Sequence, residues 1–442
     1  MTRSPMPPLS GLALLGAVAV APACWHVAAL GPDGGAGGDA GADTDTDEDV
    51  DTDAGPDSGP ELPTDCTGLD DFTLCSVVTS PDYSYDICID GVCESPGCGA
   101  LECNPPGPHF PLPDTNQRSC SDWQMWTTCP SDGEDYFGQD AQYGWDTTHD
   151  ASERFSVDVS TTPIYPMVTD NVTGLVWQGC AAGLVGEDCD YGVAAKDTLA
   201  EALAYCDGLE WGGRDDWRLP DIYELESTAD LGTIMPAVDV AAFPPITVSV
   251  IVSIPFWSSS ATSGGFGWFV AFDTGSVQVG QASSSFYVRC VRGAPTPRPV
   301  RFTRVLTAPG APVVADAVTG LVWQGCAAGL DGDACENGAV GAFTWPEALA
   351  YCEGSTWAGY ADWRLPSKEE LHSSVDHRLE APRIDTTAFP ATPAGWFWSS
   401  STYVDVTTSA VAQAWAQDLS SGWQMGSDKD IAIDVRCVRG GV

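Results

Sequence analysis

The residues that could carry out acid–base or nucleophilic chemistry are few, because histidine is scarce. The five histidines are His26, His109, His149, His372 and His377. None lies in the first copy of the duplicated segment described below, so the two copies share no imidazole. A serine or cysteine nucleophile needs a neighbouring general base to become reactive. We therefore predict that the protein is not an enzyme.

Two serine triplets, at residues 258–260 and 399–401, are the most obvious nucleophile candidates. Each directly follows a tryptophan, Trp257 or Trp398, and no base follows at a matching position. A polar run beside a large aromatic residue is typical of a buried strand end. We interpret both triplets as structural. The cysteines of each copy likewise have plausible structural partners, which argues against a reactive thiol.

The sequence Asp-Trp-Arg occurs twice and offers a further candidate. A functional carboxylate at Asp216 or Asp362 is one interpretation. The other is a structural ion pair with Arg218 or Arg364, which would lock the start of the following helix. We favour the ion pair.

Acidic loops and tryptophans are the candidates for ligand binding. Hard oxygen ligands in a disulfide-fixed loop could bind Ca²⁺, although their spacing differs between the copies. These carboxylates are Glu187, Asp188 and Asp190 in one loop and Asp331, Asp333 and Glu336 in the other. Three tryptophans could stack on a sugar ring, but alternating spacing is more typical of core residues; they are Trp268, Trp415 and Trp423. We expect no cofactor, with Ca²⁺ as the one candidate. The sequence does not identify the ligand-binding residues.

The charge of the chain narrows the range of partners. Its 442 residues include 62 acidic and 18 basic ones, for a net charge of −44. Such a chain repels nucleic-acid phosphates and anionic lipids. We therefore expect no nucleic-acid partner, and the charge disfavours polyanionic ligands.

The N-terminus and the cysteine content indicate export. Seventeen cysteines without zinc-finger spacing are typical of an oxidising compartment. Residues 1–23 read as a signal peptide, with Arg3, a short apolar run and a small-residue cleavage site. The next residue, Cys24, is a candidate for lipidation, which would leave sixteen cysteines to pair. Plain secretion is the alternative, and Cys24 could also pair elsewhere.

A lipid on Cys24 would place the protein at the outer membrane or cell surface. No later segment has the ~18 apolar residues of a membrane helix, so the lipid would be the only membrane contact. Residues 24–64 are an acidic low-complexity tether that cannot bury enough apolar surface to fold. Residues 65–111 are a cysteine-rich disulfide module. The pairing of the eight cysteines in the range 66–129 cannot be read from their spacing.

An internal duplication dominates the rest of the chain. TGLVWQGCAAGL occurs identically at 173–184 and 319–330, and four further motifs follow in the same order in both copies. These are EALAYC (201–206, 347–352), DWRLP (216–220, 362–366), FWSSS (256–260, 397–401) and VRCVRG (288–293, 435–440). The duplication predicts one domain at 112–294, including an approach segment that starts at Leu112, and a second at 295–442. The stiff linker Pro295–Pro299, at the start of the second domain, separates the two copies.

Each copy predicts two early helices and a late antiparallel sheet, an α+β domain. Capping boxes start the helices: Thr198 with Glu201 and Asp221 with Glu224, and in the second copy Thr344 with Glu347 and Ser367 with Glu370. The first helix carries Leu203 with Cys206, or Leu349 with Cys352, at helical spacing. A hairpin is predicted where 268–272 and 277–279 flank Asp-Thr-Gly, and both copies end in a strand.

Four cysteines per copy allow three disulfide connectivities. Cys180 with Cys189, and Cys326 with Cys335, are close enough in sequence to close one loop. We favour Cys206 with Cys290 and Cys352 with Cys437 for the remainder, which would join the first helix to the last strand. That clasp closes more than 80 residues and is worth about 4 kcal/mol in the loop-entropy model.

The ordered motifs TGLVWQ, EALAYC, DWRLP, FWSSS and VRCVR resemble the C-terminal domain of the Legionella collagen-like adhesin, the Lcl C-terminal domain family. The resemblance covers about 154–294 and 301–442. It implies a C-type lectin-like fold and recognition of glycans outside the cell. Sulfated glycans have the wrong charge for this acidic chain. The Glu-Pro-Asn and Trp-Asn-Asp motifs of calcium-dependent lectins are also missing.

We therefore expect a surface-exposed lipoprotein whose duplicated lectin-like domains bind an extracellular glycan or protein in an adhesion-type role. The alternative is a structural cell-envelope protein that assembles through its duplicated domains without a small ligand. An exposed aromatic cluster would favour the first hypothesis, and a large apolar patch spanning both domains would favour the second.

Overall fold

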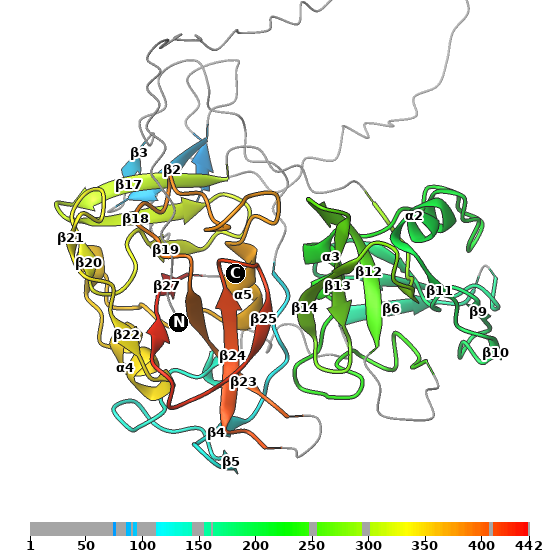
Figure 1. Cartoon of the computed structure of the whole chain (residues 1–442), viewed down its shortest axis with the longest axis horizontal. Coiled ribbons are helices and arrows are strands. Elements are labelled where there is room, and N and C mark those ends of the chain that lie inside the picture. Colours follow the sequence, from blue (N-terminus) through cyan, green and yellow to red (C-terminus); the bar gives the residue numbers. More distant parts are fainter. Residues whose placement is uncertain are drawn as a thin grey trace, which may run out of the picture. The chain divides into compact units, whose positions relative to one another are not determined.

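The computed structural model describes residues 112–143, 154–160, 162–246, 254–293, 301–405 and 410–440, together with three upstream strands (Figure 1). Those strands are β1 (Leu74–Ser76), β2 (Tyr85–Ile89) and β3 (Val92–Glu94), which form an antiparallel sheet within the predicted cysteine-rich module. The predicted signal peptide, Cys24, the acidic tether and the linker 295–299 lie outside the described residues, as do His26, His109 and His149.

Each copy of the duplication forms two larger sheets and a short two-stranded ribbon. We call residues 154–293 the first repeat and 301–440 the second repeat. The smaller sheet has the order β16-β8-β7-β6 in the first repeat and β17-β18-β19-β27 in the second. Its strands are β6 (Phe155–Asp158), β7 (Met167–Asp170), β8 (Val176–Gln178) and β16 (Val291–Arg292), then β17 (Phe302–Ala308), β18 (Ala311–Asp316), β19 (Val322–Gln324) and β27 (Val438–Arg439). The last strand of each repeat therefore pairs with a strand from its beginning.

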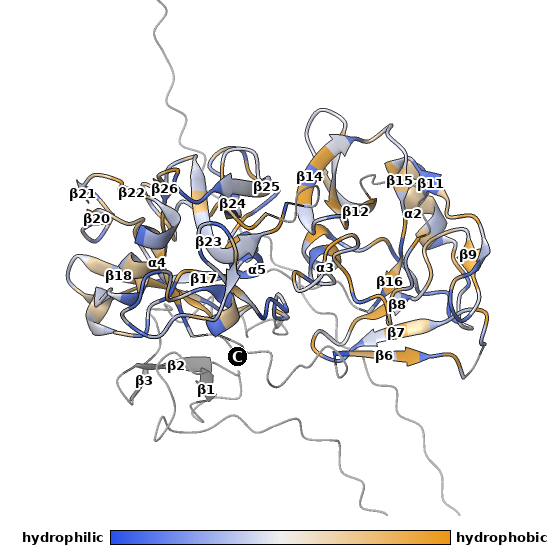
Figure 2. Cartoon of the chain, turned by 90° about the horizontal axis from the view of Figure 1, so that it is seen from below, coloured by the Kyte–Doolittle hydropathy of each residue, from blue (hydrophilic) through white to orange (hydrophobic). Residues whose placement is uncertain are grey.

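The larger sheet has five strands, in the orders β11-β15-β12-β13-β14 and β22-β26-β23-β24-β25. The predicted hairpin is present, with Trp268 opposite Val279. The strands are β11 (Lys196–Asp197), β12 (Pro255–Thr262), β13 (Phe266–Ala271), β14 (Ser276–Gln281) and β15 (Phe286–Tyr287), then β22 (Ala342–Phe343), β23 (Trp396–Tyr403), β24 (Gln413–Asp418), β25 (Gln424–Asp428) and β26 (Ile433–Asp434). Figure 2 shows the apolar residues distributed over these sheets.

The predicted helices form and begin at the predicted caps. They are α2 (Leu199–Asp207) and α3 (Ile222–Glu226) in the first repeat, and α4 (Trp345–Glu353) and α5 (Lys368–Ser373) in the second. All four capping boxes are present. The structure is nevertheless mostly β-sheet, and strands are not confined to the later part of each repeat. The early strands were not predicted; β8 and β19 are only three residues long, too short for an alternating pattern.

Disulfides close each repeat. Cys206 on α2 bonds Cys290 and Cys352 on α4 bonds Cys437, so each first helix is tied to the residue just before the last strand. Shorter loops are closed by Cys180–Cys189 and Cys326–Cys335. Tryptophans fill the cores, and those with almost no exposure include Trp177, Trp257, Trp323 and Trp398.

The approach segment (residues 112–143) packs mainly on the second repeat, although the first repeat follows it in sequence. The side-chain amide of Gln117 donates to the Thr402 carbonyl at 2.8 Å and accepts from the Thr402 amide at 2.7 Å. Lys429 Nζ donates to Ser121 Oγ at 2.7 Å. The segment contains the ribbon β4 (Cys120–Ser121) and β5 (Trp126–Thr127) and a short 3₁₀ helix at Asp140–Gln142.

This packing gives equivalent helices different surroundings. Leu349 on α4 is completely buried, in a cluster against which Tyr136 of the approach segment packs. Its equivalent on α2, Leu203, is 43% exposed. The helical spacing of Leu203 and Cys206 therefore does not place Leu203 in the core, because burial of this helix face depends on a segment that covers only α4.

Candidate functional site

A cleft of about 600 Å³ lies where the approach segment meets both repeats. The approach segment supplies one wall, the loop 231–234 of the first repeat supplies the other, and the second repeat contributes Val404. The lining residues are Asn116, Gln117, Arg118, Ser119, Trp126, Leu231, Gly232, Thr233, Ile234 and Val404. A concave site of this size, apolar with a few polar groups, has the form of a small-ligand site.

Backbone and side-chain hydrogen bonds join the two walls. Asn116 Nδ2 donates to Asp230 Oδ2 at 3.0 Å, and the Leu231 amide donates to the Thr115 carbonyl at 2.8 Å. Burial raises the pKa of Asp230, while hydrogen bonds from Asn116 and the Gly232 amide oppose that shift. The two walls can lie this close only if residue 232 is glycine, since a Cβ there would lie 2.4 Å from the Asn116 carbonyl oxygen. The cleft is therefore preorganised.

Exposed aromatic residues gather on the loop that borders the cleft. The disulfide Cys120–Cys129 closes this loop, in which Trp123, Met125 and Trp126 are 37%, 61% and 43% exposed. Asp122 Oδ1 accepts hydrogen bonds from the amides of Gln124 and Met125 at 2.7 and 2.8 Å. These bonds lower the pKa of Asp122 and hold the turn. The loop thus presents large apolar side chains to solvent on a fixed backbone.

The arrangement suits binding rather than bond-breaking. Trp126 offers an aromatic face, Leu231 and Ile234 offer apolar contacts, and Arg118 is the charged group of the lining. Arg118 Nε donates to Asn116 Oδ1 at 3.0 Å, which orients the side chain at the edge of the cleft. Stacking on an aromatic face combined with hydrogen bonds at the rim is a common way of binding a sugar ring.

The tryptophans singled out in the sequence lie elsewhere. Trp268 and Trp415 are buried on equivalent strands, in keeping with the core interpretation, whereas Trp423 is 42% exposed. Trp126 was missed because it lies outside the duplicated motifs. The signal that could have found it is the presence of two tryptophans between Cys120 and Cys129, in a loop too small to bury them.

The serine triplets connect the larger sheet to the start of the second helix. Ser258 Oγ donates to the Trp268 carbonyl at 2.8 Å, and Ser260 Oγ accepts from the Ile222 amide at 3.1 Å. In the second repeat Ser399 and Ser401 make the equivalent bonds to Trp415 and Lys368. The first and third hydroxyls of each triplet therefore have structural partners.

The Asp-Trp-Arg motifs form ion pairs with partners other than those expected. Arg218 makes a bidentate pair with Glu224 of α3 at 2.6 Å, and Arg364 does the same with Glu370 of α5. An ion pair thus locks the second helix, but it joins the arginine to a glutamate and not to the predicted aspartate. The aspartates pair instead with the last strand, Asp216 with Arg292 and Asp362 with Arg439. The spacing could not indicate this because the last strand is more than 70 residues away.

The acidic loops do not bring their carboxylates together. Among the described residues, no group of three histidine, cysteine, aspartate or glutamate side chains converges as metal ligands would. Asp333 Oδ1 accepts instead from the Gly310 amide at 2.9 Å, and Glu336 Oε2 accepts from the Ala334 amide at 2.8 Å. Glu336 thus holds its own turn, and Asp333 holds the turn between β17 and β18.

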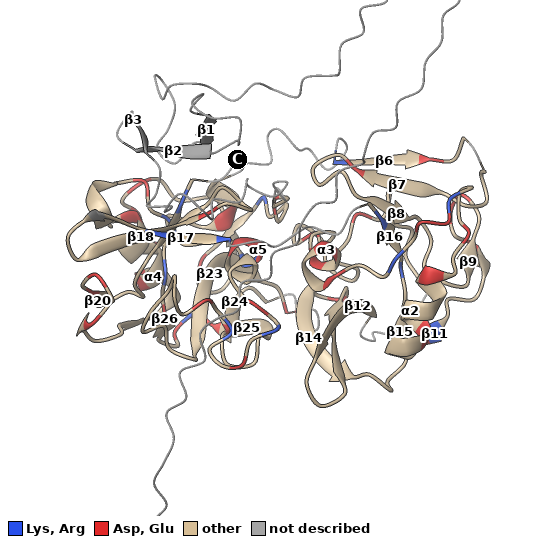
Figure 3. Cartoon of the chain, turned by 90° about the horizontal axis from the view of Figure 1, so that it is seen from above, with Lys and Arg blue, Asp and Glu red and all other residues tan. Residues whose placement is uncertain are grey.

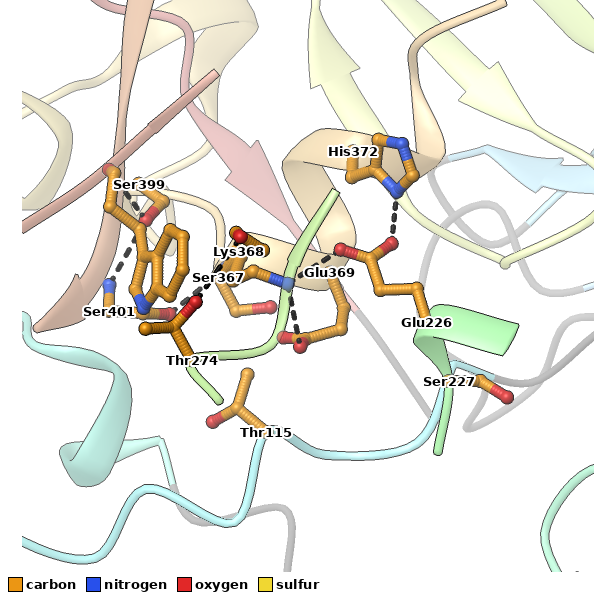
Figure 4. A network of polar contacts seen from close by, with 12 residues as sticks. Thr115, Glu226, Ser227, Thr274, Ser367, Lys368, Glu369, His372, Ser399 and Ser401 are labelled. Carbon is orange, nitrogen blue, oxygen red and sulfur yellow. Dashed lines mark hydrogen bonds and ion pairs between the residues drawn. The ribbon is translucent and has the colours of Figure 1, made fainter. Parts of the chain in front are cut away.

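A second polar cluster, which includes Glu226, Lys368 and His372, is buried between the repeats (Figure 4). His377, the other histidine of the described residues, adjoins it. Lys368 Nζ lies 2.6 Å from Glu226 Oε1 and 3.5 Å from Glu369 Oε1. Glu226 Oε2 is hydrogen-bonded to Nδ1 of His372, whose Nε2 lies 2.6 Å from Nε2 of His377. Since these groups are almost fully buried, the cluster holds the repeats together and offers no open site.

The charges of this cluster are unevenly distributed. Burial alone would raise the pKa of Glu226, but the positive charges of His372 and Lys368 outweigh it and lower that pKa to about 2. Burial raises the pKa of Glu369 to about 8, because Lys368 is already paired with Glu226 and only partly opposes the shift. Glu369 is therefore protonated at neutral pH.

The comparisons with known proteins agree with the duplication. The sequence model of the Lcl C-terminal domain matches residues 166–292 and again residues 312–439, together more than half of the chain. No curated protein sequence matches the chain.

Proposed function

Because this chain belongs to the Lcl C-terminal domain family, we propose that it is an exported recognition protein that binds an extracellular glycan in the cleft beside Trp126. The bound group is a neutral sugar, since the excess of acidic residues would repel sulfated or otherwise anionic glycans (Figure 3). The role is that of an adhesion-type protein at the cell surface.

The proposed fold of each repeat is C-type lectin-like. Support comes from a first helix whose cysteine is bonded to the residue before the last strand, a second short helix, and a last strand that pairs with an early one. The duplicated unit is therefore a disulfide-closed scaffold suited to the outside of the cell.

The observation that carries the proposal is the exposure of three large apolar side chains beside a preformed cleft. Exposed tryptophan costs solvation free energy and is retained on surfaces chiefly where it makes contacts. Here Trp123, Met125 and Trp126 lie on the short loop that the Cys120–Cys129 disulfide closes, and hydrogen bonds hold its backbone. The cleft beside them provides polar groups that would fix the orientation of a sugar.

A glycan array probed with the full chain tests the proposal. We expect specific, saturable binding to a neutral glycan, and a loss of about tenfold or more in affinity in Trp126→Ala, as stacking on an aromatic ring predicts. Trp423→Ala is the matched control, because Trp423 is equally exposed on the second repeat but does not line the cleft.

Three outcomes would contradict the assignment. They are binding that Trp423→Ala weakens and Trp126→Ala does not, binding restricted to sulfated glycans, and the absence of binding to any glycan with or without Ca²⁺. The last of these would leave assembly through the duplicated domains as the better function.

Export through residues 1–23 and lipidation of Cys24 complete the proposal. None of the described helices is long and apolar enough to cross a membrane. Metabolic labelling with a radioactive fatty acid should mark the wild-type chain and not Cys24→Ser. Equal labelling of both would rule out the anchor, and a wild-type chain released to the medium would indicate plain secretion.

A further inference from the structure

The first repeat exposes a group of apolar side chains beside its short disulfide loop. Ile164, Tyr191 and Val193 are 53%, 66% and 83% exposed. They are neighbours in the fold: Tyr191 on β10 (Tyr191–Gly192) is opposite Val185 on β9 (Leu184–Val185), and the Gly186 amide donates to the Ile164 carbonyl at 2.9 Å. We call Ile164, Val185, Tyr191 and Val193 the ribbon patch. Figure 2 shows β9 among the hydrophobic segments.

The second repeat builds the same backbone without these side chains. Its ribbon is β20 (Leu330–Asp331) with β21 (Asn337–Gly338), and the Gly332 amide donates to the Gly310 carbonyl at 2.9 Å, as Gly186 does to Ile164. Ile164, Tyr191 and Val193 therefore correspond to Gly310, Asn337 and Ala339.

The comparison of the two repeats shows that the apolar side chains of the ribbon patch are not needed for folding. Because the second repeat folds the ribbon with glycine, asparagine and alanine, the fold does not require exposed isoleucine, tyrosine and valine there. Contiguous exposed apolar side chains are unfavourable in water and mark interaction surfaces. At the three positions compared, the apolar side chains occur in the first repeat alone, so the surface that they provide is not a general property of the duplicated unit.

The negative charge around the ribbon patch indicates a positively charged partner. Glu187, Asp188 and Asp190 lie in the disulfide loop between β9 and β10, and all three are exposed. Carboxylates beside an apolar surface favour lysine and arginine side chains next to apolar ones on the partner. The same carboxylates, and a net charge of −44, would repel a second copy of this chain and an anionic membrane.

We propose that the ribbon patch binds a basic amphipathic segment of another protein, with apolar residues against Ile164, Tyr191 and Val193 and basic residues against the acidic loop. This binding surface shares no residue with the cleft beside Trp126, so it does not depend on glycan binding.

The test uses the full chain and a synthetic peptide of leucine and lysine arranged as a helix with one apolar and one basic face. We expect saturable binding by calorimetry, and a loss of at least tenfold in affinity in the triple variant Ile164→Ala/Tyr191→Asn/Val193→Ala. These residues are exposed, so the variant should fold normally, which circular dichroism checks. The control variant, Val240→Ala/Ile431→Ala, removes exposed apolar residues elsewhere and should keep its affinity within twofold.

Several results would overturn the proposal. Binding that the triple variant retains within twofold would place the peptide elsewhere, as would equal losses in the triple and control variants. A peptide of the same composition with its leucines spread around the helix should bind at least tenfold more weakly. Equal binding of that peptide would reduce the effect to unspecific charge attraction, and self-association of the chain that the triple variant abolishes would make a second copy the partner.

Discussion

Glu226 and His372 occupy equivalent positions of the two repeats, and their side chains are hydrogen-bonded to each other across the junction. A contact between equivalent residues is what an approximate twofold relation between two similar domains produces. The equivalent strands β14 and β25 are also in contact. At such a position two identical acidic residues would repel, so the divergence to glutamate and histidine turns a repulsive contact into an attractive one. Lys368, which replaces the apolar Ile222 of the first repeat, adds a second attraction to Glu226.

Replacing Glu226 by glutamine should destabilise the pair of repeats. The substitution keeps the shape of the side chain but leaves the buried ammonium of Lys368 without its nearest carboxylate. Breaking a buried ion pair from one side costs about 3–5 kcal/mol. Urea denaturation followed by tryptophan fluorescence measures this. The control is Asp216→Asn, which breaks the exposed pair with Arg292 and should cost less than about 1 kcal/mol. Equal costs for the two variants would show that the cluster does not hold the repeats together.

Stability should fall as the pH rises from about 5 to about 7. The folded chain keeps the proton of Glu369 up to its pKa of about 8, whereas the unfolded chain releases it near the ordinary value of 4.5. Unfolding therefore releases a proton in this range, and a higher pH favours unfolding. Asp140 acts in the same direction, since burial raises its pKa to about 7. Burial lowers the pKa of Lys429 to about 7. This residue makes stability rise with pH, but only above about pH 7.

Urea denaturation at several pH values, in the wild type and in Glu369→Gln, measures this dependence. The variant should lose part of the slope because glutamine does not titrate. Glu226 sets the acid limit: its folded pKa of about 2 lies below its unfolded value, so its contribution is present above about pH 4.5 and is lost as the pH falls toward 2. An unchanged slope in Glu369→Gln would mean that Glu369 is ionised in the folded protein at neutral pH.

The two disulfides of a repeat should contribute unequally to stability. Cys206–Cys290 spans 84 residues and Cys180–Cys189 spans nine. The loop-entropy model gives about 4.5 kcal/mol for the long bond and about 2.5 kcal/mol for the short one. Paired serine variants of each bond, compared by urea denaturation, test the difference. A larger loss for the short bond would mean that native-state effects outweigh the entropy of the unfolded chain.

Leu349→Ala and Leu203→Ala form a matched pair on equivalent helices. Leu349 is completely buried, and truncating a buried leucine costs about 2–5 kcal/mol. Leu203 is 43% exposed, so its truncation should cost well under about 1 kcal/mol. Thermal or urea unfolding of the two variants measures the difference. Similar losses would show that the approach segment does not control the burial of this helix face.

Features that depend on nearby residues could be predicted from the chain alone. A capping box needs only four consecutive residues, so the starts of α2, α3, α4 and α5 are fully specified locally. Because the motifs occur twice, both copies support the same helix starts and the same disulfide pairs. The disulfides link the pairs that the spacing favoured, because two adjacent cysteines close a short loop and leave one long-range pair.

The partners of charged side chains could not be predicted in the same way. Asp216 pairs with Arg292 rather than with Arg218, because the last strand returns beside the Asp-Trp-Arg motif only in the folded chain. The cleft could not be predicted from the sequence for a similar reason. Its walls come from residues near 116, 231 and 404, and no local pattern relates them.

The sequence by itself determined the repeated unit, its helix starts, its hairpin and its covalent closure, since each depends on interactions within one copy that short motifs specify. Only the tertiary structure decided which copy the approach segment covers. Gln117 bonds the backbone of Thr402, 285 residues away, and not the equivalent position of the nearer repeat. The same is true of the contact between Glu226 and His372. These choices depend on shape and charge complementarity between surfaces that exist only after each repeat has folded.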